Sequence, residues 1–210
     1  MTLANLLPLA ALALLARPVP LDDAAVIKAQ RPSYPFKACV ISGRVLADPV
    51  EPVEFVIDER LVRLCCDKCV EKVRADKAAI LKKIDAAVVA EQRPRYPLTV
   101  SAVSDAKLDD KAVDYVHGTR LVRLANAAEV ETFKKDPAPV MKRIDKALIE
   151  AQLETYPLEN CIVTDEPMGG EMGDPIDHLY GTQLVRFCCK ACIRMFNKNP
   201  DVYLVKLAKK

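Results

Sequence analysis

The stretch LVRLCCDKC at residues 61–69 returns almost unchanged as LVRFCCKAC at residues 184–192. Between the two lies LVRLANAAE at residues 121–129, which has the same opening but no cysteine. Recurrence of one phrase along a chain is typical of tandem repeats, in which each copy forms one supersecondary unit. The sequence therefore predicts three related units, and the middle unit differs from the others by the loss of its cysteines.

Further landmarks surround this phrase in every unit. A Tyr-Pro pair precedes it, with Gln four residues and Asp eleven residues before the Tyr, and two apolar positions eleven residues apart follow it. The landmarks are Asp23, Gln30, Tyr34, Val73 and Ile84 in unit one, Asp85, Gln92, Tyr96, Phe133 and Ile144 in unit two, and Asp145, Gln152, Tyr156, Phe196 and Leu207 in unit three. A frame shared so widely predicts a common fold for all three units.

The residues around the repeated phrase alternate between apolar and polar. This pattern at 53–64, 113–124 and 176–187 predicts two strands joined by a tight turn, with His117-Gly118 and Tyr180-Gly181 at the turns. Apolar residues at helical spacing follow each hairpin, and the break at Asp136-Pro137 places a proline near the start of a second helix. We therefore expect an α+β protein of three small hairpin-plus-helix modules joined by helical connectors.

The chain begins with an apolar run from Leu6 to Ala16 that contains several small residues. This pattern is typical of a signal peptide, and the run is too short to span a bilayer. We expect residues 1–20 to direct export to the periplasm or cell envelope, although a buried N-terminal helix is the alternative. The predicted modules are then residues 21–91, 92–151 and 152–210, with no membrane span in the mature chain.

Charge and composition exclude several classes of function. The formal net charge is +2, and the basic residues form no dense block interleaved with aromatic residues, so nothing predicts a nucleic-acid partner. We find no nucleophile with an adjacent base, and the acidic and basic residues scatter along helices as solvated faces. The sequence therefore predicts a binding protein and not an enzyme.

All eight cysteines lie in the outer two units, at Cys39, Cys65, Cys66, Cys69, Cys161, Cys188, Cys189 and Cys192. The matching positions of the middle unit hold Ser101, Ala125, Asn126 and Glu129. The four cysteines of a unit are thus absent together while the rest of the frame stays. Residues that are lost as a set are expected to act as a set.

Metal binding and disulfide formation could each make four cysteines act together. Cys65 and Cys69 are spaced to share one face at the start of a helix, and the hairpin would bring Cys39 to them. Thiolates without histidine or carboxylate neighbours favour Zn²⁺ or Cu(I). Disulfides suit an exported chain, but a bridge from Cys39 would leave two thiols over. Thiol-disulfide exchange through Cys66 and Cys69, or their unit-three counterparts, is a third alternative.

The segment RFCCKACIRMFNKNPDVYL at residues 186–204 resembles the YHS/TRASH group of small metal-binding modules. That group has an early Cys, then aromatic-Cys-x3-Cys-x3-Phe, then a tail of Asn or Asp followed by Pro-x-x-Tyr-Leu. Unit three matches with Cys161, Phe187, Cys188, Cys192, Phe196, Asn199, Pro200, Tyr203 and Leu204. Unit one matches at Cys39, Cys65 and Cys69 but has Leu64, Val73 and Lys77 at the aromatic, Phe and Pro positions. Unit two keeps only Phe133, Asp136 and Pro137.

The resemblance implies treble-clef-like zinc-ribbon modules that take part in trafficking of, resistance to or sensing of heavy metals. The ligands it implies are Cys39, Cys65 and Cys69 in unit one and Cys161, Cys188 and Cys192 in unit three, with Cys66 and Cys189 as further ligands. One Zn or Cu(I) ion is expected in each of these two units, and another envelope protein is a candidate partner. The alternative is an interaction scaffold whose zinc ions or disulfides are purely structural.

Overall fold

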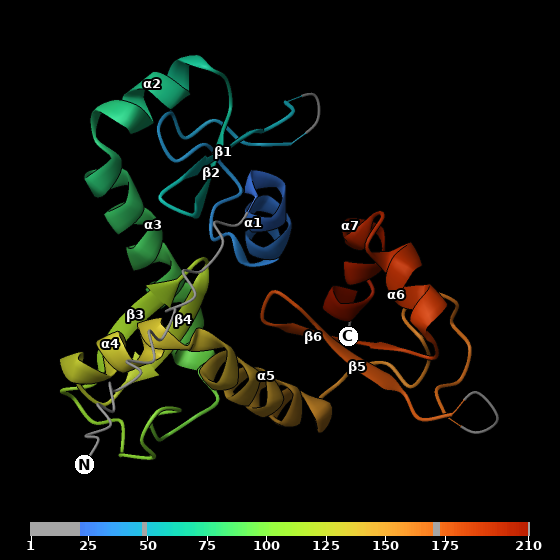
Figure 1. Ribbon diagram of the computed structural model, residues 1–210. Coiled ribbons are helices and arrows are strands. Elements are labelled where there is room, and N and C mark those ends of the chain that lie inside the picture. Colours follow the sequence, from blue (N-terminus) through green and yellow to red (C-terminus); the bar gives the residue numbers. More distant parts are fainter. Residues whose placement is uncertain (1–21, 48–49, 170–172, 210) are drawn as a thin grey trace, which may run out of the picture.

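The computed structural model describes residues 22–47, 50–169 and 173–209. The proposed signal peptide at residues 1–20 lies outside the described residues. The fold is α+β, as the repeat predicts, and each unit contains a two-stranded antiparallel hairpin (Figure 1).

Each unit contains a helix, then a hairpin, then a second helix. Unit one consists of α1 (Asp23–Gln30), the 3-10 helix η1 (Arg31–Ser33), β1 (Val53–Ile57), β2 (Arg60–Leu64) and α2 (Lys68–Ala75). The connector α3 (Lys77–Gln92) leads to η2 (Arg93–Arg95), β3 (Val113–His117), β4 (Arg120–Leu124) and α4 (Ala127–Lys135) of unit two. The connector α5 (Pro137–Leu153) leads to β5 (Ile176–Tyr180), β6 (Gln183–Phe187), α6 (Lys190–Phe196), α7 (Pro200–Leu204) and η4 (Leu207–Lys209) of unit three.

The helix that precedes each hairpin packs on that hairpin. α1 contacts β1 and β2, α3 contacts β3 and β4, and α5 contacts β5 and β6. α5 begins with a proline at its first position, where the missing N–H costs no helical bond. Its buried residues Val140, Ile144 and Leu148 recur every four positions and so share one face.

The three hairpins have identical registers, but their turns differ from the predicted ones. Two residues form each turn, and they are Gly118-Thr119 and Gly181-Thr182, so His117 and Tyr180 end strands instead. Both glycines have φ near +60°, which the first position of a type II′ turn requires. Unit one also has a two-residue turn, formed by Asp58 and Glu59, but both of its residues have positive φ, as a type I′ turn requires.

A glutamine carboxamide fastens every hairpin turn to the preceding helix. In unit two the Nε2 of Gln92 donates to the carbonyl of Thr119 at 2.8 Å, while its Oε1 accepts from the N–H of Leu121 at 2.9 Å. Gln30 and Gln152 make the equivalent pairs of bonds in units one and three. Gln92 is buried, and these two hydrogen bonds satisfy the polar atoms of its side chain, which burial removes from water. The recurring glutamine of the sequence frame is explained by this contact.

Each unit has its own small core beneath the hairpin. Val62, Leu64 and Val73 pack together in unit one, and Val122, Leu124 and Phe133 take their places in unit two. Val185, Phe187 and Phe196 do so in unit three. The middle unit therefore builds the same core without any cysteine.

The turns of the second and third hairpins lie against the start of unit one. A Cβ atom on Gly181 would stand 2.6 Å from the carbonyl oxygen of Pro32, and one on Gly118 would stand 3.1 Å from the side chain of Gln30. Glycine is needed at residue 181 both for this approach and for its positive φ. Among the described helices, none is long and apolar enough to cross a membrane.

Candidate metal centres

A tight loop presents the first cysteine of each outer unit. The N–H of Cys39 donates to the carbonyl of Arg44, and the loop closes with a bond from Gly43 to the carbonyl of Cys39, both at 2.8 Å. Cys161 is held in the same way by Glu166 and Asp165. Gly43 and Asp165 have positive φ, so the chain reverses sharply just after the cysteine. The thiol is therefore held at the base of a tight, hydrogen-bonded loop under the hairpin.

The remaining cysteines lie where the second strand meets the following helix. Cys65 and Cys66 precede α2, and Cys69 is its second residue. We predicted that Cys65 and Cys69 would share a face of one helix, but α2 begins only at Lys68. In unit three Cys189 is the N-cap residue of α6, with Cys188 before it and Cys192 inside the first turn. A bend at the strand end, and not helical periodicity, brings these thiols together.

In unit one the three cysteine sulfurs Cys39, Cys65 and Cys69 lie within 4.8 Å of one another. The Sγ atom of Cys69 is 3.8 Å from that of Cys39 and 3.9 Å from that of Cys65. Thiolates bound tetrahedrally to zinc at about 2.3 Å lie about 3.8 Å apart, so this spacing fits a thiophilic ion. Cys66 is exposed, and its Sγ lies 3.8 Å from those of Cys65 and Cys69.

Unit three repeats the arrangement in a more enclosed form. Cys161, Cys188 and Cys192 also have all three sulfurs within 4.8 Å of one another, and all three residues are buried. The Sγ of Cys192 is 3.6 Å from those of both Cys188 and Cys189. The structure thus brings six predicted ligands together as two groups of three, with Cys66 and Cys189 beside them. Both groups are compatible with metal binding.

Hydrogen bonds and burial set the ionisation of these thiols in opposite directions. Burial alone would raise the pKa of Cys39, but hydrogen bonds from Ser42 and from nearby backbone N–H groups lower that pKa to about 6. A similar balance lowers the pKa of Cys161 to about 7. Burial and neighbouring thiols raise the pKa of Cys69 to about 12 and also raise that of Cys192. One thiol in each group therefore ionises near neutral pH, and an ion would displace the remaining protons.

In the middle unit a carboxylate takes the place of the thiol cluster. Oε2 of Glu129 accepts from Ser101 Oγ at 2.6 Å and from the N–H of Ala125 at 2.9 Å, and its Oε1 accepts from Ser104 Oγ at 2.5 Å. Burial alone would raise the pKa of Glu129, but these three donors lower it. The side chain connects the loop, the strand end and the helix that three cysteines connect elsewhere. The middle unit therefore closes the same junction without an ion.

Another of the replaced positions, Asn126, has a separate role. Asn126 stands where unit one has Cys66, and its Oδ1 accepts from the N–H groups of Ala128 and Glu129 at 3.0 and 3.2 Å. This is a standard N-cap, which stabilises the start of α4. Cys189 holds the same place before α6 and makes no such bond.

No family model, curated protein or solved structure matches the chain. The assignment of these two centres therefore depends on their geometry and on the internal comparison among the three units.

Sequence reasoning missed one set of residues next to the thiols. A hydroxyl stands three residues after the first ligand position in every unit, at Ser42, Ser104 and Thr164. Ser42 Oγ lies 3.3 Å from Cys65 Sγ, and Thr164 Oγ1 lies 3.7 Å from Cys188 Sγ. Ser104 binds Glu129 from the same place in the frame. Their shared register with the first ligand was the signal that could have identified them.

Proposed function

We propose that this chain is an exported, non-enzymatic protein that binds heavy metal ions and serves metal trafficking, resistance or sensing. Units one and three each take one Zn or Cu(I) ion. Unit two, which lies between them in the sequence, binds no metal and serves as a spacer or docking surface. The modules are treble-clef-like members of the YHS/TRASH group, with boundaries at residues 21–91, 92–151 and 152–210.

The internal comparison among the units carries this proposal. Three units share one frame, and only the two that have cysteines gather three sulfurs within 4.8 Å of one another in the described structure. Unit two closes the same junction with Glu129 and its three donors. Because this fold can form the junction of loop, strand and helix without an ion, a metal ion in the outer units would have a role beyond folding.

The donor set supports the choice of metal. Three or four sulfur donors with no carboxylate or imidazole among them favour soft or borderline ions over Ca²⁺ or Mg²⁺. Cys39, Cys65 and Cys69 would hold the ion of unit one, and Cys161, Cys188 and Cys192 that of unit three. Cys66 and Cys189 are the additional ligands, and Cys66 is exposed to solvent.

Exchange of the bound ion tests trafficking against a structural role. We would load the chain that begins at residue 21 with zinc or copper, then add EDTA or bathocuproine disulfonate and record far-UV circular dichroism. The proposal predicts that both ions leave while the spectrum keeps its helical signal. Loss of the helical signal in step with the metal would instead support the scaffold with structural ions.

A further inference from the structure

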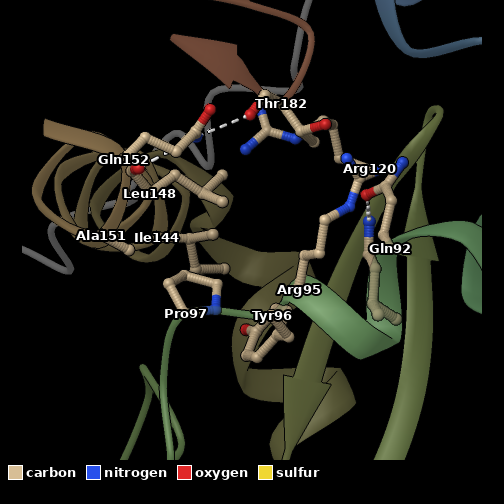
Figure 2. Close-up of a pocket in the computed structure, with 11 residues that line it drawn as sticks. Gln92, Arg95, Tyr96, Pro97, Arg120, Ile144, Leu148, Ala151, Gln152 and Thr182 are labelled. Atoms are coloured by element: carbon tan, nitrogen blue, oxygen red, sulfur yellow. Dashed lines mark hydrogen bonds between the residues drawn. The ribbon is translucent and has the colours of Figure 1, made fainter. Parts of the chain in front are cut away.

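A cavity of about 410 Å³ lies between unit two and the hairpin turn of unit three, away from both thiol groups (Figure 2). Its volume falls within the range of roughly 300–1,000 Å³ that is usual for small-molecule sites. Figure 2 shows side chains of α5 on one side of the space and Arg95, Arg120 and Gln92 on the other. Most of its lining residues belong to the middle unit, for which metal binding provides no role.

The corresponding junction between units one and two is closed. Ser33 stands where unit two has Arg95, and its Oγ lies 2.7 Å from Thr119 Oγ1, which in turn donates to the carbonyl of Gln30 at 2.9 Å. Thr119 is only 1% exposed there. At the second junction Thr182 takes the place of Thr119 and is partly exposed. The two junctions are otherwise equivalent. The one with the short Ser33 is closed, and the one with the long Arg95 contains a cavity.

The two walls of the cavity have different chemistry. Ile144, Leu148 and Ala151 from α5 form an apolar wall, and Pro97 with the ring of Tyr96 extends it. Gln152 turns its carboxamide to the hairpin, where its Nε2 donates to the carbonyl of Thr182 at 2.9 Å. A ligand with an apolar body would bury that body against this wall.

The opposite wall carries two guanidinium groups. Arg120 pairs with Asp145 at 2.7 Å and is mostly buried, so its charge is balanced and its position fixed. Arg95 has a 69% exposed side chain, and the acidic partner described for it is Glu91, at 3.9 Å. An exposed ion pair at that distance contributes little. Arg95 is therefore able to bind an anionic group of a ligand.

We propose that this cavity binds a small amphipathic carboxylate, with its alkyl or aromatic body against Leu148 and Ile144 and its carboxylate on Arg95. The site goes beyond metal binding and depends on no cysteine. It gives the middle unit a ligand of its own.

The test is calorimetric titration of the metal-loaded chain with decanoate, below the concentration at which decanoate forms micelles. Arg95→Gln removes the charge at the same size, and Leu148→Phe fills the cavity from the apolar side. Lys146→Gln is the matched control, because Lys146 is an exposed cation of α5 that does not line the cavity. Thermal unfolding of each variant verifies that it is folded.

The proposal predicts one saturable decanoate site in the wild type. The affinity should fall by about tenfold or more in Arg95→Gln and stay unchanged in Lys146→Gln. Leu148→Phe should remove binding while the protein stays folded, and 1-decanol should bind much more weakly than decanoate. Absence of saturable binding to the wild type would overturn the proposal. Equal affinity of Arg95→Gln and Lys146→Gln would also overturn it, because the carboxylate would not then be at Arg95.

Discussion

Units two and three share a frame but close it with different chemistry. In unit three the junction of loop, strand and helix contains the buried thiols of Cys161, Cys188 and Cys192. In unit two it contains the carboxylate of Glu129, held by two serine hydroxyls and one backbone N–H. A fully satisfied hydrogen-bond network can fix a buried junction as an ion can. This fold therefore does not itself require thiolates.

Removal of all three cysteines of one group should have the largest effect, a change in the amount of bound metal. Replacing Cys161, Cys188 and Cys192 together with serine should lower bound metal from about two ions per chain to about one, because these three thiolates are the proposed ligands of one ion. The measurement is inductively coupled plasma mass spectrometry on purified variants. The matched change of Cys39, Cys65 and Cys69 should give the same stoichiometry with the other unit loaded. Full stoichiometry in either variant would contradict the assignment of two separate centres.

The carboxylate of the middle unit should matter to that unit's stability. Glu129→Gln keeps the shape but replaces a charged acceptor with a neutral amide, so local opening should become easier by about 1–3 kcal/mol. Hydrogen exchange of peptides that cover residues 113–135 measures this opening. Glu131→Gln on the same helix is the control, since Glu131 is 71% exposed. Equal exchange in the two variants would show that the Glu129 network does not hold the unit together.

The same carboxylate predicts a dependence on pH. The pKa of Glu129 is lowered below its ordinary value of 4.5 in the folded chain. A lowered folded pKa stabilises the fold above the unfolded pKa, and the stabilisation is lost as pH falls through the folded value. The difference in thermal stability between wild type and Glu129→Gln should thus be constant above pH 4.5 and shrink at lower pH. A difference that grows with acidity would contradict this sign.

The two groups of three cysteines should differ modestly in how fast they release a bound ion. Cys65 is partly exposed and its neighbour Cys66 is exposed, whereas Cys188 is buried. A competing chelator would therefore have easier access to an ion bound in unit one. With one group removed at a time, the ion in unit one should pass to the chelator a few times faster than the ion in unit three, as stopped-flow absorbance would measure. Faster transfer of the ion from unit three would contradict the expected effect of exposure.

Much of the fold was predictable because its signals are local. Alternation at residues 113–124 predicted a hairpin, and Asp136-Pro137 predicted the start of α5. The turn residues were misplaced by one position, because both His117-Gly118 and Gly118-Thr119 are compatible with a turn. The role of Glu129 was not predicted, since it depends on loops that only the folded chain brings together.

The site was predictable in composition but not in arrangement. The joint absence of four cysteines from unit two identified the residues, and the structure brings six of the eight into two groups. Helical spacing was the wrong reason for their proximity, because Cys65 lies before α2 begins. The cavity beside Arg95 left no pattern in the sequence, since it depends on how two units meet.

Metal binding is tested most directly by the metal content per chain of protein isolated from its own cells, with free thiols counted in the same sample. We expect about two zinc or copper ions per chain, one for each group of three cysteines. A chain without metal whose thiols are blocked would contradict it. The outer units would then be stapled by disulfides and would bind no ion.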